Sequence, residues 1–364
     1  MLVFIRKQSE VPVLQLLTTI PALIGFVSAC FASEAGVKEM SVPQSGRDLA
    51  VTVWYPAAPG GKPTVVGDNK VFKGAPASVD APVVPGRHPL VLLSHGSGSR
   101  VQAMGWLATE LAKAGFVVAG PNHPGTTSGF STPAETPKLW QRTGDLSAVI
   151  DALAGDPAWS SVIDADRIGV VGFSLGGATA MELSGARANL GAYASYCDSY
   201  KKWDCAWFAS GTGYVDDEKV DVEKLDLRSI DRVRFEQSNL DRRIKTAVLA
   251  DPGLAQAYDA ASLKQIAIPM HFINLGEGDT IPLAVISDRL AKLTPKGTYA
   301  TVAGATHFSF LPECKEGAAE MLKSFGEFDP ICSDEASRPR GELHAALIGL
   351  VKDALVRDLM VPEQ

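Results

Sequence analysis

The hydrophobic positions of the chain first follow a strand period and then gather into short apolar runs. Leu49, Val51 and Val53 recur at every second position within residues 47–55, which is typical of a half-buried strand. This alternation predicts an antiparallel hairpin over residues 37–56. Residues 57–88 are dense in proline, glycine and alanine, which predicts a surface excursion.

From residue 90 onward, strand patterns alternate with helical patterns. This order predicts an α/β fold, in which a mostly parallel central sheet carries helices on both faces. The predicted strands lie at 89–94, 116–120, 167–172, 244–250, 268–274 and 298–302, and the predicted helices at 102–114, 137–154 and 174–187.

Residues 189–243 interrupt this alternation and predict an inserted cap segment. The aromatic residues of its first half either line a lid or acyl pocket or form a small core of their own, and the sequence leaves both readings open. Its second half, residues 215–243, is charged and helix-like, which predicts a solvated helix face. The aromatic residues are Tyr193, Tyr196, Tyr200, Trp203, Trp207 and Phe208.

Residues 167–177 carry the strongest chemical signal. A β-branched run leads into Gly172-Phe173-Ser174-Leu175-Gly176, and small residues that suit a helix start follow at once. A strand that enters a helix through such a turn is a nucleophile elbow, in which glycines leave room for a serine at strained backbone angles. We therefore expect Ser174 to be a nucleophile. The N–H of Leu175, at the helix N-terminus, is expected to face a developing oxyanion.

A second small-residue loop follows the predicted strand 89–94. Its sequence, His95-Gly96-Ser97-Gly98-Ser99, lets the backbone pass close to a ligand. In hydrolases of this architecture, a loop after an early strand donates the second oxyanion N–H, and Ser97 is the best-placed donor. The alternative is a Gly/Ser turn with a hydrogen-bonded histidine, and we expect His95 itself to be structural.

Three histidines beyond the elbow compete for the role of catalytic base. His271 lies inside a strand pattern, which favours a core or edge role, and His344 lies in the amphipathic stretch 342–359, which favours the surface. His307 follows strand 298–302 and a loop of small residues, a position that can bring its imidazole over the sheet edge. His307 is therefore the predicted base.

The acid is ambiguous, because two aspartates each close a predicted strand. Asp251 and Asp279 both fit the chain order Ser, Asp, His of such hydrolases, and both lie on the sheet edge where α/β sites form. Two further polar residues, His123 and Asp145, are expected to fix loops near the site by hydrogen bonds.

Together these motifs resemble those of bacterial proteins called predicted dienelactone hydrolases, which are similar to the platelet-activating factor acetylhydrolase group and more distantly to chlorophyllases. The resemblance implies an α/β-hydrolase fold over residues 36–364 with the cap at 189–243, Asp251 as the acid, and Ser97 and Leu175 as oxyanion donors. True dienelactone hydrolases use a cysteine nucleophile, so the family name does not indicate the substrate. The motifs that carry the resemblance are residues 172–177, 94–96, 121–126, 249–253 and 304–311.

The expected chemistry is that of a serine esterase that needs no metal and no cofactor. The imidazole takes the serine proton as the hydroxyl attacks an ester carbonyl, and the aspartate orients the ring. An acyl-enzyme forms, and water releases it. Two alternatives stay open: a phospholipase A2-like hydrolase of short-acyl phospholipids, and a binding protein that keeps the scaffold without turnover.

Charge and the N-terminal sequence indicate partners and location. The net charge of −7 leaves no basic footprint, so we expect a small-molecule or lipid-like ester and no nucleic acid as partner. Arg6 and Lys7 precede an apolar stretch broken by prolines, which predicts a signal peptide over residues 1–32. The alternative is a lipoprotein signal that leaves Cys30 acylated. Both predict export, with membrane contact only through a lipid anchor.

The remaining cysteines suit an oxidising compartment. Without Cys30, the chain has an even set of four. Sequence proximity predicts the pairs Cys197–Cys205 and Cys314–Cys332. Their spacings lack the C-x-x-C pairs that zinc sites use.

Overall fold

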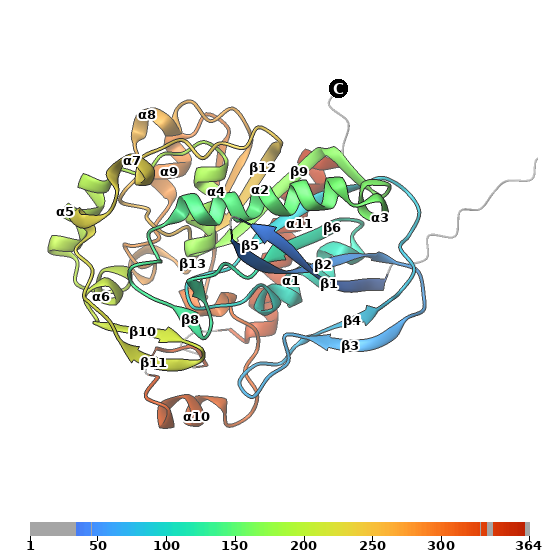
Figure 1. The fold of residues 1–364 in the computed structure, drawn as a ribbon, viewed down its shortest axis with the longest axis horizontal. Helices are drawn as coiled ribbons and strands as arrows, with labels where there is room; N and C mark the ends of the chain where they lie inside the picture. The colour runs from blue at the N-terminus through green and yellow to red at the C-terminus, as the bar shows by residue number, and fades with distance from the viewer. Residues whose placement is uncertain (1–33, 45, 328, 333–337, 361–364) are drawn as a thin grey trace, which may run out of the picture. The chain divides into compact units, whose positions relative to one another are not determined.

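A central sheet with helices packed against it forms the framework of the chain (Figure 1). The computed structural model describes residues 34–44, 46–327, 329–332 and 338–360. Within these ranges ten strands pair in the order β14-β13-β12-β9-β5-β6-β2-β1-β4-β3. The strands from β14 to β6 are all parallel, whereas β2 pairs antiparallel with β6 and with β1. The expected mostly parallel sheet and the N-terminal hairpin are therefore confirmed.

The expected surface excursion contains two strands that extend the sheet edge. β3 and β4 form an antiparallel pair, and β4 runs parallel to β1. The strands of the sheet are β1 (Glu34–Gln44), β2 (Arg47–Ala57), β3 (Lys62–Val66), β4 (Ala75–Val79), β5 (His88–Ser94), β6 (Val117–Pro121), β9 (Ile163–Phe173), β12 (Ile244–Ala250), β13 (Met270–Leu275) and β14 (Gly297–Val302).

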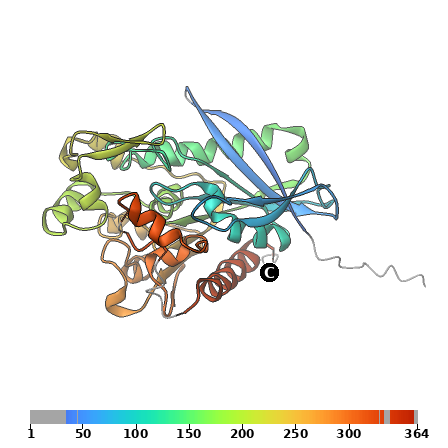
Figure 2. The same ribbon diagram turned by 90° about the horizontal axis from the view of Figure 1, so that it is seen from below.

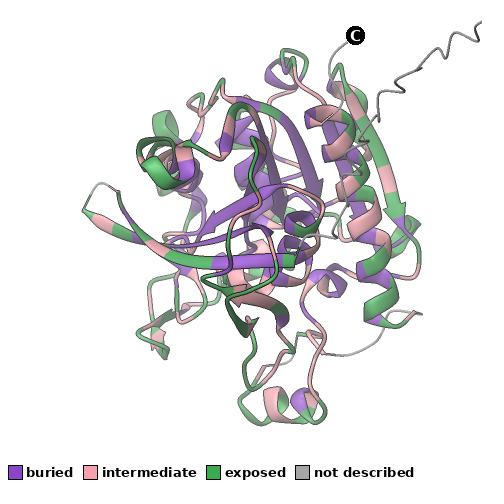
Figure 3. Ribbon diagram, turned by 90° about the vertical axis from the view of Figure 1, so that its right-hand side faces the viewer, coloured by how far each residue is buried: buried purple, intermediate pink, exposed green. Residues whose placement is uncertain are grey.

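Helices cover both faces of the sheet, as its strand composition requires. α2 (Leu139–Gly155) and α4 (Leu175–Leu183) lie on one face, and α1 (Gly105–Lys113) and α11 (Arg340–Leu359) lie on the other (Figure 2). The central strands are buried except near their amino ends (Figure 3). Successive side chains of a strand point to opposite faces, so Val170 packs with α2 and α4 while Val171 packs with α1 and α11.

Shorter elements connect the main layers. The helices are α3 (Pro157–Ser160), α8 (Ala260–Leu263), α9 (Asp288–Leu293) and α10 (Ala318–Ser324), and the 3₁₀ turns are η1 (Val101–Met104), η3 (Gly278–Thr280) and η4 (His307–Phe310).

The inserted segment is more broken than its charge pattern predicts. The helix expected over 215–243 is wrong: a hairpin, a 3₁₀ turn and one short helix occupy this stretch. Asp216 and Asp217 both have positive φ, 51° and 63°, so they form the two-residue turn between β10 and β11. Asp226 and Asp231 cap the two turns that follow. The elements are α5 (Leu190–Ser199), α6 (Asp204–Phe208), β10 (Thr212–Val215), β11 (Glu218–Asp221), η2 (Leu227–Ser229) and α7 (Arg232–Phe235), and β10 also pairs with β8 (Phe130–Ser131), which pairs with β7 (Thr126–Thr127).

Both predicted disulfides form: Cys197 bonds to Cys205, and Cys314 to Cys332. Across the described ranges, none of the helices combines the length and apolar character that crossing a bilayer needs. The predicted signal peptide, with the alternative acylation of Cys30, lies outside the described residues.

Candidate active site

Ser174 stands in the sharp turn between β9 and α4. Its backbone angles, φ 55° and ψ −119°, are strained for a residue with a side chain. Glycine is required on both sides: a Cβ on Gly172 would lie 2.1 Å from the Gly176 carbonyl oxygen, and a Cβ on Gly176 would lie 1.8 Å from the Ser94 carbonyl oxygen. The Ser174 backbone is also tied to the next strand by its N–H, which donates to the Ala250 carbonyl at 3.0 Å.

His307 connects Ser174 to Asp251. Its Nε2 lies 3.2 Å from the Ser174 Oγ, and its Nδ1 lies 2.8 Å from the Asp251 Oδ2. Asp251 is fully buried after β12, where its other oxygen accepts from the Asn274 Nδ2 at 2.7 Å and from the Leu275 N–H at 2.9 Å. The structure brings these three predicted residues together, whereas Asp279 is exposed in η3.

Two backbone N–H groups lie beside this serine without an acceptor. Leu175 is the first residue of α4, and Ser97 lies in the turn after β5. A Cβ on Gly96 would lie 3.4 Å from the Ser174 Cβ, so the two turns are in contact. Within the described ranges, neither the Ser97 N–H nor the Leu175 N–H has a hydrogen-bond acceptor.

Comparison with known proteins gives the family of this chain. A model of the alpha/beta hydrolase family matches residues 90–320, more than half of the sequence. The chain belongs to the alpha/beta hydrolase family. Among solved structures, it is similar to a ferulic acid esterase from Streptomyces cinnamoneus, with a TM-score of 0.57 and 18% identity over 92% of this chain and 93% of the other. At that identity the likeness shows the fold. A search of curated proteins gave no match.

One aromatic residue of the hydrolase's insertion lies at the serine site and not in the insertion's core. The Trp203 ring packs edge-on against the His307 ring, with centroids 5.3 Å apart, and stacks on Phe308. Trp203 is 36% exposed and has a positive φ of 53°. Its neighbours hold it there: Cys205 is in a disulfide, and Asp204 accepts a 2.6 Å hydrogen bond from the Tyr193 hydroxyl. Tyr193 and Phe208, by contrast, are buried in the insertion's own core.

The loop of His307 is anchored to α11. His344 is buried, contrary to the expectation of a surface position, and its Nε2 lies 3.1 Å from the Ser309 carbonyl oxygen and 3.0 Å from that of Leu311. Its ring stacks on Trp106, and the Trp106 Nε1 donates to the Phe310 carbonyl at 3.1 Å. The amphipathic pattern was misleading here because a histidine on the buried face of a helix can form hydrogen bonds to the carbonyls of a neighbouring loop.

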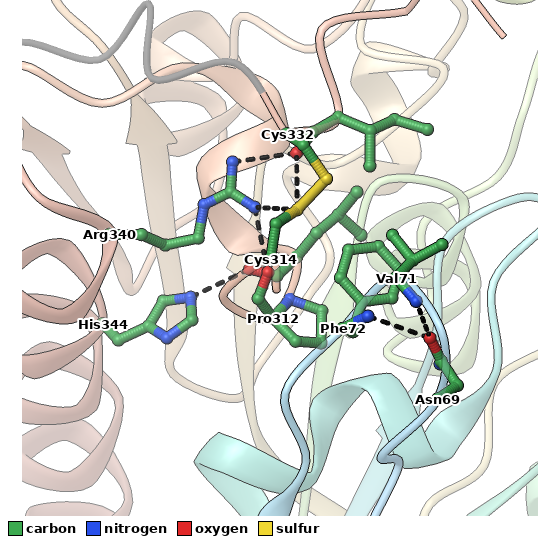
Figure 4. The surroundings of a disulfide bond; sticks show 10 residues. Asn69, Val71, Phe72, Pro312, Cys314, Cys332, Arg340 and His344 are labelled. Atoms are coloured by element: carbon green, nitrogen blue, oxygen red, sulfur yellow. Dashed lines mark hydrogen bonds between the residues drawn. A yellow bond between two sulfur atoms is a disulfide. The ribbon is translucent and has the colours of Figure 1, made fainter. Parts of the chain in front are cut away.

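The second disulfide reinforces the same loop (Figure 4). The Arg340 guanidinium lies beside Cys314 and donates to the carbonyls of Pro312 and Ile331, each at 2.9 Å. Residues 71–73 add two backbone hydrogen bonds to residues 313 and 315 from the other side. The chain that follows the 3₁₀ turn of His307 is therefore fixed at three points.

Sequence reasoning missed Arg142, which lies fully buried beneath the site. Burial lowers the pKa of its guanidinium to about 9. The expected loop-fixing roles of His123 and Asp145 are seen: the His123 Nδ1 lies 3.0 Å from the Asp145 Oδ2. Among the described residues, no cluster of histidine, cysteine and acidic side chains suits a metal ion.

Proposed function

We propose that this hydrolase is a serine esterase that cleaves carboxylic esters through an acyl-enzyme. The observation that supports this most strongly is the position of His307, which contacts the Ser174 hydroxyl through one ring nitrogen and the buried Asp251 carboxylate through the other. A hydroxyl needs such a base because its own pKa leaves it protonated at neutral pH.

Each group then has a defined task. His307 Nε2 removes the Ser174 proton as Oγ bonds to the ester carbonyl carbon, and the carbonyl oxygen becomes an oxyanion. The N–H groups of Ser97 and Leu175 stabilise that oxyanion. Asp251 holds the ring with Nδ1 protonated and stabilises the imidazolium. The proton passes to the departing alcohol as the carbon–oxygen bond breaks, and water releases the acid by the same steps in reverse.

The surroundings support an ester with an apolar group beside the carbonyl. Trp203 and Phe308 form an aromatic wall next to His307. Aromatic walls favour flat or apolar substituents by about 0.5–1.5 kcal/mol beyond area burial. The resemblance to predicted dienelactone hydrolases and to platelet-activating factor acetylhydrolases adds short-acyl esters to the proposal, and the ferulic acid esterase with the same fold adds aryl esters.

We also propose that the protein is exported. The two disulfides support this, because disulfides persist in oxidising compartments. Sequencing the N-terminus of the protein recovered from cells would separate cleavage after residue 32 from acylation at Cys30.

Covalent labelling with a fluorophosphonate tests the esterase proposal. We expect the wild-type chain to be labelled at Ser174 and to hydrolyse a panel of p-nitrophenyl and feruloyl esters, and the Ser174→Ala variant to lose label and at least about 10⁴-fold in turnover. A chain that neither takes the label nor cleaves any ester would instead favour the binding-protein alternative.

A further inference from the structure

A second Ser-His-Asp chain lies directly beneath the site and is fully buried. The Ser94 Oγ is 3.0 Å from the His123 Nε2, and the His123 Nδ1 is 3.0 Å from the Asp145 Oδ2. All three side chains have no exposed surface. The other oxygen of Asp145 accepts from Arg47 at 2.6 Å. Burial lowers the pKa of His123 well below its usual value, and nearby Arg142 lowers it further.

The series of hydrogen bonds begins at Arg142, in the first turn of α2. Its Nη2 donates to the Ser94 Oγ at 3.1 Å and also to the His95 carbonyl. The Ser94 hydroxyl then donates to His123, and His123 donates to the aspartate. Because the Ser94 oxygen already accepts from a cation and has no access to substrate, this serine cannot act as a nucleophile. Its position implies an architectural role.

Arg142 reaches both segments that carry the free N–H groups of the site. Through the His95 carbonyl it holds the start of the Ser97 turn. On the other side, its Nε donates at 2.9 Å to the Thr179 Oγ1, and that hydroxyl donates at 3.0 Å to the carbonyl of Leu175. One buried guanidinium therefore spans the two proposed oxyanion donors.

The rest of the turn around Ser97 is also tied down by this network. Arg142 Nη1 donates to the Thr126 Oγ1 at 2.6 Å, and the Thr126 carbonyl accepts from the Gly98 N–H at 2.9 Å. The His95 Nε2 accepts from the His123 N–H at 3.1 Å, and its Nδ1 donates to the Gly96 carbonyl at 2.7 Å. Hydrogen bonds therefore hold the backbone on both sides of Ser97, at the Gly96 carbonyl and at the Gly98 N–H.

We propose that Arg142, supported by Ser94, His123 and Asp145, positions the two oxyanion donors relative to each other. These are positioning residues, since none of them touches the reacting atoms. The proposal rests on the esterase function proposed above. It concerns transition-state stabilisation, so kcat should fall without a matching rise in KM when the network is weakened.

Two matched pairs of substitutions test this. Thr179→Val removes the hydroxyl that links Arg142 to Leu175, whereas Thr179→Ser keeps it. His123→Asn breaks the buried chain, whereas His271→Asn breaks a similar chain at the opposite edge of the sheet, where His271 bridges Thr298 at 2.8 Å and Asp358 at 2.7 Å. The second pair separates loss of position from loss of stability.

The assay measures p-nitrophenyl acetate hydrolysis and phenylboronic acid binding by the full chain. Removing one oxyanion donor costs about 10²–10³-fold in kcat, so a displaced donor should cost roughly tenfold or more. We expect Thr179→Val and His123→Asn to lower kcat and boronic acid affinity by that factor with KM within about twofold, and the two control variants to keep both. Folded Thr179→Val and His123→Asn variants with wild-type kcat would overturn the proposal.

Amide hydrogen exchange separates this proposal from the esterase proposal. If the wild-type chain cleaves no ester, the esterase proposal fails, and the positioning of the turn is judged from the exchange of the Gly98 N–H alone. We expect His123→Asn to speed that exchange at least about tenfold and His271→Asn to leave it unchanged. Equal exchange in the two variants would sink the positioning role whether or not the wild type is active.

Discussion

Two hydrogen-bonded serine–histidine–aspartate triads lie next to each other at the carboxyl edge of the sheet, and their surroundings differ. In one, Ser174 occupies a strained turn and contacts the imidazole of His307, which packs against Trp203. In the other, Ser94 is the last residue of β5, has no exposed surface and accepts from Arg142. The same three residue types therefore carry the proposed chemistry in one place and a proposed positioning role in the other.

A third hydrogen-bonded triad, of Thr298, His271 and Asp358, lies at the amino edge of the strands. There, Asp358 also accepts from the Thr246 hydroxyl at 2.7 Å. Carboxyl ends of parallel strands, not amino ends, provide the open edge on which α/β sites form. What identifies a candidate catalytic serine is thus a side chain that is not fully buried, unpaired N–H groups in the turns around it and a place on that edge.

Replacing the aspartate of each triad should give the largest difference between the Ser174 triad and the Ser94 triad. Asp251→Asn should lower kcat about 10⁴-fold, because the imidazole loses the partner that fixes its tautomer. Asp145→Asn should lower kcat only about tenfold but should reduce the free energy of unfolding by about 3 kcal/mol. It removes the charge of a buried carboxylate that bonds to His123 and pairs with the partly exposed Arg47. Steady-state kinetics and chemical denaturation of the same preparations give both numbers.

Asp279→Asn is the control for this pair, since its side chain is exposed in η3. Its kcat should stay within about twofold of wild type. A loss of more than about a hundredfold in Asp279→Asn, with an active Asp251→Asn, would transfer the role of the acid to the later strand.

The sequence predicted the Ser174 triad better than the buried network around Ser94, for a physical reason. The elbow is a local motif, and its strand, turn and helix follow one another within residues 163–183. Arg142 has no local signature, because its four partners come from separate strands, loops and a helix that lie 16 to 48 positions away. A buried arginine in the first turn of an amphipathic helix looks like a surface residue until those acceptors are placed around it.

The choice of acid and the fold of the insertion also depend on contacts that the sequence pattern does not reveal. Both Asp251 and Asp279 end strands on the correct edge, and only the path of the η4 loop brings His307 to one of them. In the insertion, charge spacing suggested a helix, but paired aspartates with positive φ turned the chain back as a hairpin. Local turn chemistry therefore outweighed periodicity.

Acid pH should weaken the histidine hydrogen bonds that hold the His307 loop and the Ser97 turn. The resulting loss of stability can be measured for His344. Burial lowers the pKa of His344 to about 4, and the pKa values of His95 and His123 are also lowered by burial. A depressed folded-state pKa means that the stability is complete above the unfolded value of about 6.5 and is lost as the pH falls toward 4. Asp145, whose pKa burial raises to about 6, opposes this trend, since its contribution is lost as the pH rises.

Urea unfolding at pH 7 and pH 5 measures this effect. His344 alone should make the free energy of unfolding about 2 kcal/mol lower at pH 5. His344→Gln keeps a donor for the Ser309 or Leu311 carbonyl but cannot titrate, so the difference between the two pH values should shrink by about that amount. An unchanged difference would mean that the His307 loop does not depend on a neutral imidazole.

The smallest expected effect concerns the aromatic wall of Trp203 and Phe308 beside His307. Trp203→Ala removes the ring that packs on His307 and Phe308, so KM for esters with bulky or aryl groups should rise about threefold to tenfold, while acetate esters change little. Trp207→Ala is the matched control: its Nε1 donates to the Thr136 Oγ1 at 2.9 Å and so ties the insertion to the segment before α2. This variant should lower stability without changing the ratio of KM values. Trp203 is held at a strained φ next to a disulfide-bonded segment, and such strain is retained where the surrounding structure fixes a side chain in place. If both variants changed the KM ratio equally, the effect would belong to the whole insertion and not to the Trp203 ring. The Ser174 triad would then differ from the Ser94 triad only in its access to solvent and its unpaired N–H groups.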